Sequence, residues 1–208
     1  MALVLVIGAL AVAAGVFAVP VSAVGSSAAE VAKISFKKKL TPGQTNHTIA
    51  YYWEPSGSLS LNANYQNRVV SVRERIMYPG GGMTNPIILW RTTVYSDSKM
   101  DFTQNNNLLS GAAASTSVWR KNSSNQWYNS TNQMDTYDWV FGKITLNHYY
   151  MKDYSNAKNE LIIMHEMMHV YGAKDISDDP SSIMYKKTSW TCTGLTPDAN
   201  KLLNNKYS

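Results

Sequence analysis

The chain has 208 residues, of which 44% are hydrophobic and 16% are charged, and its formal net charge is +5. This length suffices for one medium-sized domain with a buried core, and the composition is that of a globular protein rather than a disordered one. The tightest basic cluster, Lys37-Lys38-Lys39, lacks interleaved aromatic residues and indicates a solvated segment, so we expect no nucleic-acid partner. The single cysteine, Cys192, excludes an intramolecular disulfide.

The N-terminal segment predicts export. Residues 1–29 carry no charged side chain, residues 3–19 are almost wholly apolar, and Pro20 precedes the small residues Val21-Ser22-Ala23. Signal peptidase prefers small residues three residues before and directly before its cleavage site, so we predict a signal peptide at 1–23. The apolar run is also long enough for an uncleaved membrane anchor. We therefore expect a secreted, extracellular protein, or an extracytoplasmic one held at the membrane only if the segment stays uncleaved.

The rest of the chain predicts a propeptide or linker at 24–44 and one folded domain at 45–208. Within the domain, β-branched, aromatic and periodic apolar residues predict the following elements. Strands are expected at 48–53, 87–95 and 139–150, a helix at 62–77, and an irregular region at 96–135 with a short strand around Val118.

Two further helices are predicted in the C-terminal third. One runs from 157 to about 171, capped by Ser155 or Asn156. The other follows Thr196-Pro197, with Thr196 as its N-cap. Its buried face is expected to contain Leu202, Leu203 and Tyr207. Strands and a helix followed by further helices indicate the α+β class.

The helix predicted at 157–171 carries the pattern His165-Glu166-x-x-His169-x-x-Gly172-x-x-Asp175. Residues four apart share one face of a helix, so the two histidines can bind one metal ion together. Glu166 lies beside the first ligand, where its carboxylate can take a proton from water polarised by the ion. Gly172 lets the chain leave the helix, and Asp175 can then return as a third ligand.

The pattern alone does not decide which residue is the third metal ligand. No histidine follows His169 and no glutamate follows Glu166, so a downstream His or Glu ligand is excluded. We favour Asp175, with Asp178 and Asp179 as alternatives. The other candidates are Asp198 and Cys192 downstream and His148 upstream, and for Cys192 we favour a structural role in a C-terminal loop.

The segment from Ile144 to Tyr207 resembles metzincin zinc metalloendopeptidases, and matrixins in particular. The motif above, the run Asp179-Pro-Ser-Ser-Ile-Met-Tyr185 and the closing Leu-Thr-Pro-Asp helix carry the resemblance. An aspartate as third ligand is the variant found in snapalysin-like proteases. One departure is that the proline which follows Met-Tyr in matrixins is Lys186 here.

The resemblance implies a metzincin-like fold with a twisted, mostly parallel sheet, an active-site helix, a Met-turn at Met184 and a C-terminal helix. It implies Zn²⁺ held by His165, His169 and Asp175, with Glu166 as general base. Residues 45–208 would then form a metalloprotease catalytic domain. It is expected to be a monomer that cleaves a protein or peptide substrate. A Ca²⁺ site at 95–101 is the only other metal site considered, and an ordinary polar turn is favoured there.

Two alternatives to a general protease stay open. A non-catalytic secreted protein that keeps zinc for stability would need a closed site with four protein ligands, for which Cys192 is a candidate. Glu166 argues against it, because a structural site has no use for that carboxylate. A protease with one dedicated substrate cannot be told from a general one by sequence.

Overall fold

The computed structural model describes residues 26–41, 47–55, 57–107, 109 and 111–208. The predicted signal peptide or membrane anchor at 1–23 lies outside the described residues. Within the described part, none of the helices combines the length and the apolar character that crossing a bilayer requires.

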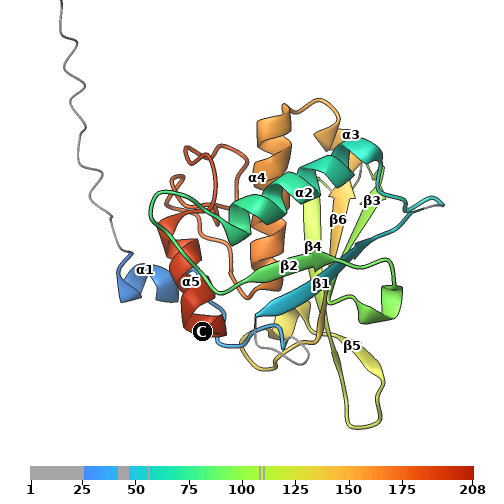
Figure 1. The fold of residues 1–208 in the computed structure, drawn as a ribbon, viewed down its shortest axis with the longest axis horizontal. Helices are drawn as coiled ribbons and strands as arrows, with labels where there is room; N and C mark the ends of the chain where they lie inside the picture. Colours follow the sequence, from blue (N-terminus) through green and yellow to red (C-terminus); the bar gives the residue numbers. More distant parts are fainter. Residues whose placement is uncertain (1–25, 42–46, 56, 108, 110) are drawn as a thin grey trace, which may run out of the picture.

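A mixed six-stranded sheet in the order β2-β1-β3-β6-β4-β5 forms the centre of the fold (Figure 1). Strands β2, β1, β3 and β6 are parallel to one another, whereas β4 is antiparallel to β6 and β5 is antiparallel to β4. The strands are β1 (Thr48–Trp53), β2 (Ile88–Arg91), β3 (Met100–Asn105), β4 (Ala114–Lys121), β5 (Trp127–Asn129) and β6 (Phe141–Asn147).

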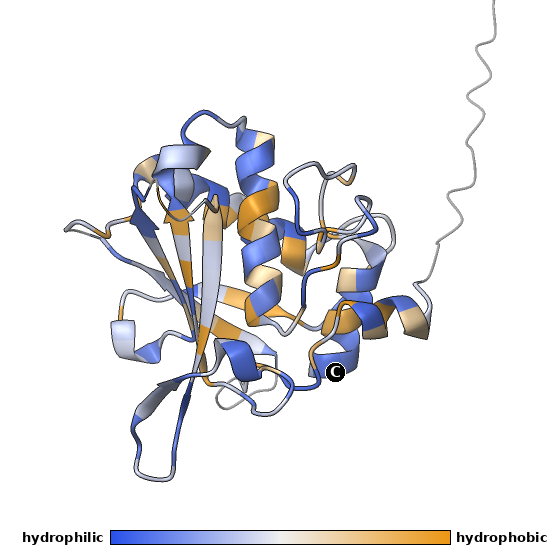
Figure 2. Ribbon diagram, turned by 180° about the vertical axis from the view of Figure 1, so that it is seen from behind, coloured by the Kyte–Doolittle hydropathy of each residue, from blue (hydrophilic) through white to orange (hydrophobic). Residues whose placement is uncertain are grey.

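Two long helices, α2 (Ala63–Met77) and α4 (Asn156–Val170), lie on the same side of the sheet and pack against each other (Figure 1). Hydrophobic and hydrophilic residues alternate along α4, hydrophobic ones also lie on the strands beside it, and the β4–β5 hairpin is mainly hydrophilic (Figure 2). The shorter helices are α1 (Ala28–Lys33), α3 (His148–Met151) and α5 (Pro197–Tyr207). The α+β prediction is confirmed.

Local sequence explains where the two long helices begin. The side chain of Asn62 accepts a hydrogen bond from the Tyr65 N–H, and the side chain of Ser155 accepts one from the Lys158 N–H. Each cap satisfies one of the backbone donors that a helix start leaves without a partner. Between the helices, the Glu160 carboxylate accepts hydrogen bonds at 3.1 and 2.9 Å from two arginines of α2. They are Arg68 and Arg75.

Helix α4 is buried along most of its length and lies very close to β6. A Cβ atom added at Gly142 would lie 2.5 Å from a methyl carbon of Val170, closer than atoms can approach without moving. The glycine therefore sets the distance between the sheet and the last turn of α4, the turn that carries His169. Packing therefore holds the motif helix against the sheet.

Several predicted boundaries within the sheet were wrong. The region 96–135, expected to be irregular apart from a short strand around Val118, contains β3, β4 and β5, and β4 confirms the strand around Val118. Strand β3 is buried on both faces from Met100 to Thr103, so it lacks the alternation that marks a half-buried strand. The strand predicted at 87–95 ends at Arg91, and the one predicted at 139–150 ends at Asn147.

Residues 26–41, part of the predicted propeptide or linker, pack against the predicted catalytic domain. Val31, Ile34 and Leu40 are buried in the same hydrophobic core as the sheet and α4. The Phe36 N–H donates a 2.9 Å hydrogen bond to the carbonyl of Gly172, the glycine of the metal-ligand pattern. This segment therefore contributes to the position of the chain that follows α4.

Gly142→Ala is expected to lower the free energy of unfolding by about 1–3 kcal/mol, because the β-branched Val170 cannot rotate away from the new methyl group. Urea denaturation measures the change. Val170→Ala would remove the clash, so the double variant should be more stable than the sum of the single effects predicts. Strictly additive effects would show that the two residues do not limit each other.

Candidate metal centre

His165 and His169 lie one turn apart on α4, and backbone carbonyl groups orient both rings. The Nδ1 of His165 lies 2.8 Å from the carbonyl oxygen of Ile183, and the Nδ1 of His169 lies 2.9 Å from that of Ala173. A carbonyl oxygen can only accept, so each Nδ1 must carry the hydrogen. The two Nε2 atoms are then the ones that can bind a metal ion.

The chain reverses directly after α4. Gly172 has φ +96°, its N–H donates to the carbonyl of His169, and the Ala173 N–H donates to that of Met168. This pair of hydrogen bonds is the Schellman motif, which needs a left-handed residue after the helix. A Cβ at Gly172 would also lie 2.9 Å from the carbonyl oxygen of Lys38, so only glycine fits here.

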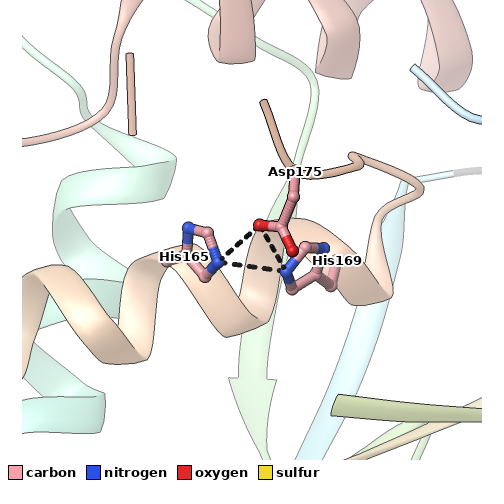
Figure 3. A group of neighbouring side chains, drawn as sticks. All are labelled: His165, His169 and Asp175. Atoms are coloured by element: carbon pink, nitrogen blue, oxygen red, sulfur yellow. Dashed lines mark hydrogen bonds and ion pairs between the residues drawn. The ribbon is translucent and has the colours of Figure 1, made fainter. Parts of the chain in front are cut away.

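The reversal brings Asp175 back to the two histidines (Figure 3). The two Nε2 atoms are 3.1 Å apart, and Oδ1 of Asp175 lies 3.1 Å from that of His165 and 3.5 Å from that of His169. Bonds of about 2.0–2.1 Å to a tetrahedral zinc ion would place donor atoms about 3.3 Å apart. The triangle of donor atoms therefore has the size of one face of a zinc coordination tetrahedron.

The pKa values of His169 and Asp175 depend on each other and on the neighbouring charges. Burial lowers the pKa of His169, but hydrogen bonding to Asp175 and the negative charge of Glu166 outweigh it and raise the pKa to about 9. Burial raises the pKa of Asp175, but its hydrogen bonds to His165 and His169 outweigh this effect and hold the pKa well below its usual range. The raised pKa favours a protonated His169 ring beside the Asp175 carboxylate.

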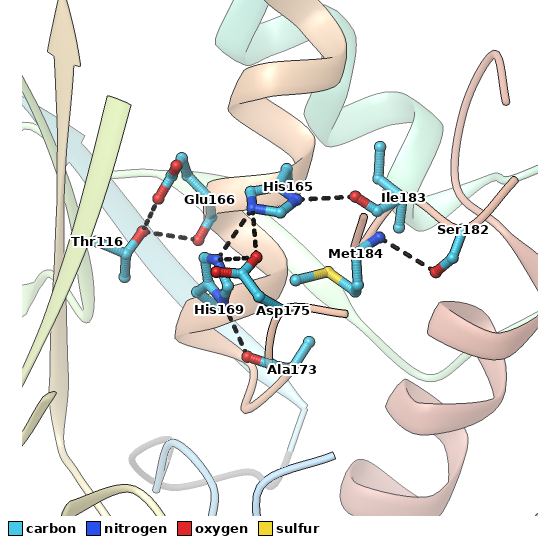
Figure 4. A network of polar contacts seen from close by, with 9 residues as sticks. All are labelled: Thr116, His165, Glu166, His169, Ala173, Asp175, Ser182, Ile183 and Met184. Atoms are coloured by element: carbon cyan, nitrogen blue, oxygen red, sulfur yellow. Dashed lines mark hydrogen bonds and ion pairs between the residues drawn. The ribbon is translucent and has the colours of Figure 1, made fainter. Parts of the chain in front are cut away.

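The Glu166 side chain is held by β4 (Figure 4). The Thr116 hydroxyl lies 2.7 Å from Oε2 of Glu166 and 3.0 Å from its backbone carbonyl oxygen, so it can donate to either. Glu166 is only 7% exposed, but it lines the same cleft as the three candidate ligands. The sequence did not reveal this contact, because Thr116 and Glu166 are 50 residues apart. A run of small residues around Thr116 is the only local pattern there.

The turn that contains Met184 supports the site from the other side. The Met184 side chain extends toward His165, His169 and Asp175 (Figure 4). Two contacts hold the turn to the start of α5. The Ile183 N–H donates to Thr196 Oγ1 at 3.2 Å, and the Ser182 hydroxyl donates to the Asp198 carboxylate at 2.5 Å. Thr196, at the predicted N-cap position, therefore bonds this turn instead of capping α5 with its side chain.

The other candidate ligands have different partners. Within the described residues, His165, His169 and Asp175 form the one group of three or more His, Cys, Asp or Glu side chains close enough to share an ion. Three aspartates bond elsewhere: Asp178 pairs with Lys33, Asp179 accepts from Ser181, and Asp198 accepts from Ser182.

The two remaining candidates also lie apart from this group. Cys192 is a free thiol packed against the core, and burial raises its pKa. His148 was expected on a strand, but it begins α3, where its Nδ1 lies 3.0 Å from the Tyr65 hydroxyl. Residues 95–101, considered for calcium, begin with a short 3₁₀ turn at Tyr95–Asp97.

A cleft of about 580 Å³ lies in front of the three candidate ligands. Its lining includes Phe36, Lys174 and Lys186. A second pocket of about 240 Å³ shares His165, Glu166 and Lys186 with the cleft, so the two adjoin. The donor set is thus open to molecules larger than water.

Comparison with known proteins adds no identification. No protein-family model matches the chain, and no curated protein matches its sequence significantly.

We expect the zinc affinity of this site to fall as the pH drops below about 9, because zinc must displace the proton that His169 then carries. The raised pKa stabilises the metal-free fold fully below 6.5, the ordinary pKa of histidine, and this contribution is lost as the pH rises through 9. Histidine-ring NMR titration of the metal-free protein, with zinc affinity measured at each pH, tests both statements.

Asp175→Asn is the control, because it removes the carboxylate that raises the pKa of His169. The His169 midpoint should then move down. A wild-type midpoint near 6.5 would contradict the predicted coupling.

Proposed function

We propose that the chain is a secreted zinc-dependent endopeptidase of the metzincin class, matrixin-like, with aspartate as third ligand. The observation that carries the proposal is the triangle of donor atoms from His165, His169 and Asp175, which has the size of a zinc tetrahedron face. The tight turn at Met184, which accepts the His165 Nδ1–H through its Ile183 carbonyl, supports the same assignment.

The donor set suits zinc in particular. Two neutral imidazoles and one carboxylate are three protein ligands, the number found in catalytic zinc sites that keep a position for water. When bound, zinc supplies a Lewis acid that polarises a carbonyl group and lowers the pKa of water from about 15.7 toward about 7. A structural zinc site would need a fourth protein ligand, and the described group offers three beside an open cleft.

Glu166 is the general base in this proposal. It is next to a ligand in sequence and lines the cleft, so its carboxylate can accept the proton of the attacking water. The same carboxylate then delivers that proton to the leaving amine. Thr116 holds Oε2 by a hydrogen bond, and this contact orients the carboxylate.

The substrate backbone would pair with the free edge of β4. Strand β5 pairs with β4 only at residues 119–121, and in the described part of the chain residues 114–117 have no strand partner on that side. This edge lies beside α4, with Thr116 bonded to Glu166. An extended peptide added along it would lie across the cleft, in the way that strand addition binds peptides elsewhere.

Glu166→Gln is expected to retain zinc and to lower kcat for casein or a peptide substrate about 10²–10⁴-fold, because the amide cannot accept the water proton. Asp175→Ala should lose both zinc and cleavage. Metal analysis and a protease assay on the same samples separate the two effects. Asp178→Asn, a change at a surface aspartate paired with Lys33, should leave zinc content and cleavage unchanged. A fully active Glu166→Gln protein would contradict the role of Glu166 as general base.

Thr116→Val is expected to lower kcat about tenfold with zinc content and KM little changed, because it removes the hydroxyl that orients Glu166 but keeps the shape of the side chain. Thr116→Ser, which restores a hydroxyl, should recover most of the loss. A loss of zinc in Thr116→Val, or no recovery in Thr116→Ser, would mean that the residue acts through packing alone.

A further inference from the structure

We propose that Lys186 makes this site selective for substrates with a carboxylate side chain directly after the scissile bond. The inference rests on the endopeptidase function proposed above and names its substrate class. It starts from the smaller pocket of about 240 Å³, which adjoins the cleft and has Lys186 on the border between the two.

The direction of the peptide decides which of its side chains reaches this pocket. Antiparallel pairing is slightly more stable per residue than parallel pairing. A peptide antiparallel to β4 places its C-terminal half beside the start of that strand. The smaller pocket is lined by residues 111–114, the segment that enters β4, and by His165 and Glu166. The side chain that enters it therefore belongs to the residue that follows the scissile bond.

The chemistry of the pocket suits an acidic side chain with an apolar stem. Ile162 and Trp190 contribute apolar surface, and Lys186 contributes a positive charge. Among the described lining residues Glu166 is the one acidic group, and the reaction itself uses it. The indole N–H of Trp190 is buried and has no hydrogen-bond acceptor within the described part of the chain.

Neither lysine that lines the cleft is ion-paired among the described residues, although the carboxylates of Glu166 and Asp175 line the same cleft. The two lysines are Lys186 and Lys174, and other lysines and arginines of the chain do form ion pairs. The nearby Asp178 is already paired with Lys33. A substrate carboxylate would give Lys186 the partner that the fold does not provide. Lys174, which lines the same cleft and lies over the Phe36 ring, adds a second positive charge to it.

The test compares cleavage of peptides that differ only in the residue after the scissile bond, with Glu, Gln or Lys at that position. The enzymes are the wild type, Lys186→Glu and Lys187→Glu. Lys187 is the matched control, because it is the next residue, is exposed and lines neither the cleft nor the smaller pocket. Both variants change the net charge equally, so any effect of the overall field is the same in both.

For the wild type we expect kcat/KM to be about 2–5-fold higher for Glu than for Gln, the range that one exposed ion pair supplies. Lys186→Glu should reverse the order in favour of Lys, and Lys187→Glu should keep the wild-type order. A Glu-to-Gln ratio near one, or equal shifts in the two variants, would overturn the selectivity while the endopeptidase function stands. If the wild type cleaves none of the peptides or casein, the endopeptidase proposal fails and the selectivity with it.

Discussion

The structure depends on the convergence of three electron-pair donors on one point. Both histidine rings turn Nε2 toward Asp175 because backbone carbonyl groups bind the hydrogen on Nδ1. Three such donors within 3.1–3.5 Å of one another repel unless a proton or a cation lies among them. A single proton, as the raised pKa of His169 indicates, satisfies this need in the metal-free protein. A dication satisfies it for all three donors at once.

The rest of the fold keeps these donors in place. Gly142 allows α4 to lie close to β6, and Gly172 allows the chain to turn back so that Asp175 reaches the helix. The end of α4 is held further by Trp139, whose indole N–H donates to the carbonyl of Val170, and by Tyr207, whose hydroxyl donates to that of Tyr171. A tryptophan from the middle of the chain and a tyrosine from its C-terminal helix therefore support the turn between the second and third candidate ligands.

Sequence predicted the parts of this structure whose signals are local. Any helix places His165 and His169 on one face, because they are four residues apart. The Ser155 cap and the glycine after the helix mark its two ends. The burial of Leu202, Leu203 and Tyr207 in α5 also followed from periodicity and is confirmed. Asp175 was favoured as the third member because of its spacing from Gly172, and the structure brings it to the histidines.

The rest depended on contacts between distant segments. Thr116 is bonded to Glu166 only because β4 lies beside α4, and no short pattern contains both residues. Strand β3 was missed because burial on both faces hides the alternation of a strand, and the packing of residues 26–41 on the domain was not apparent from a polar, lysine-rich segment. Lys186 drew notice only as a departure from the matrixin pattern, and its place between two pockets emerged from the fold.

X-ray absorption spectroscopy of the zinc-loaded protein tests the central claim most directly, because it measures the ligand set itself. We predict three protein ligands, two imidazole nitrogens and one carboxylate oxygen at about 2.0–2.1 Å, with one further light atom from solvent. A sulfur shell at about 2.3 Å would place Cys192 on the metal and contradict the account. So would a protein that binds no zinc when it is folded.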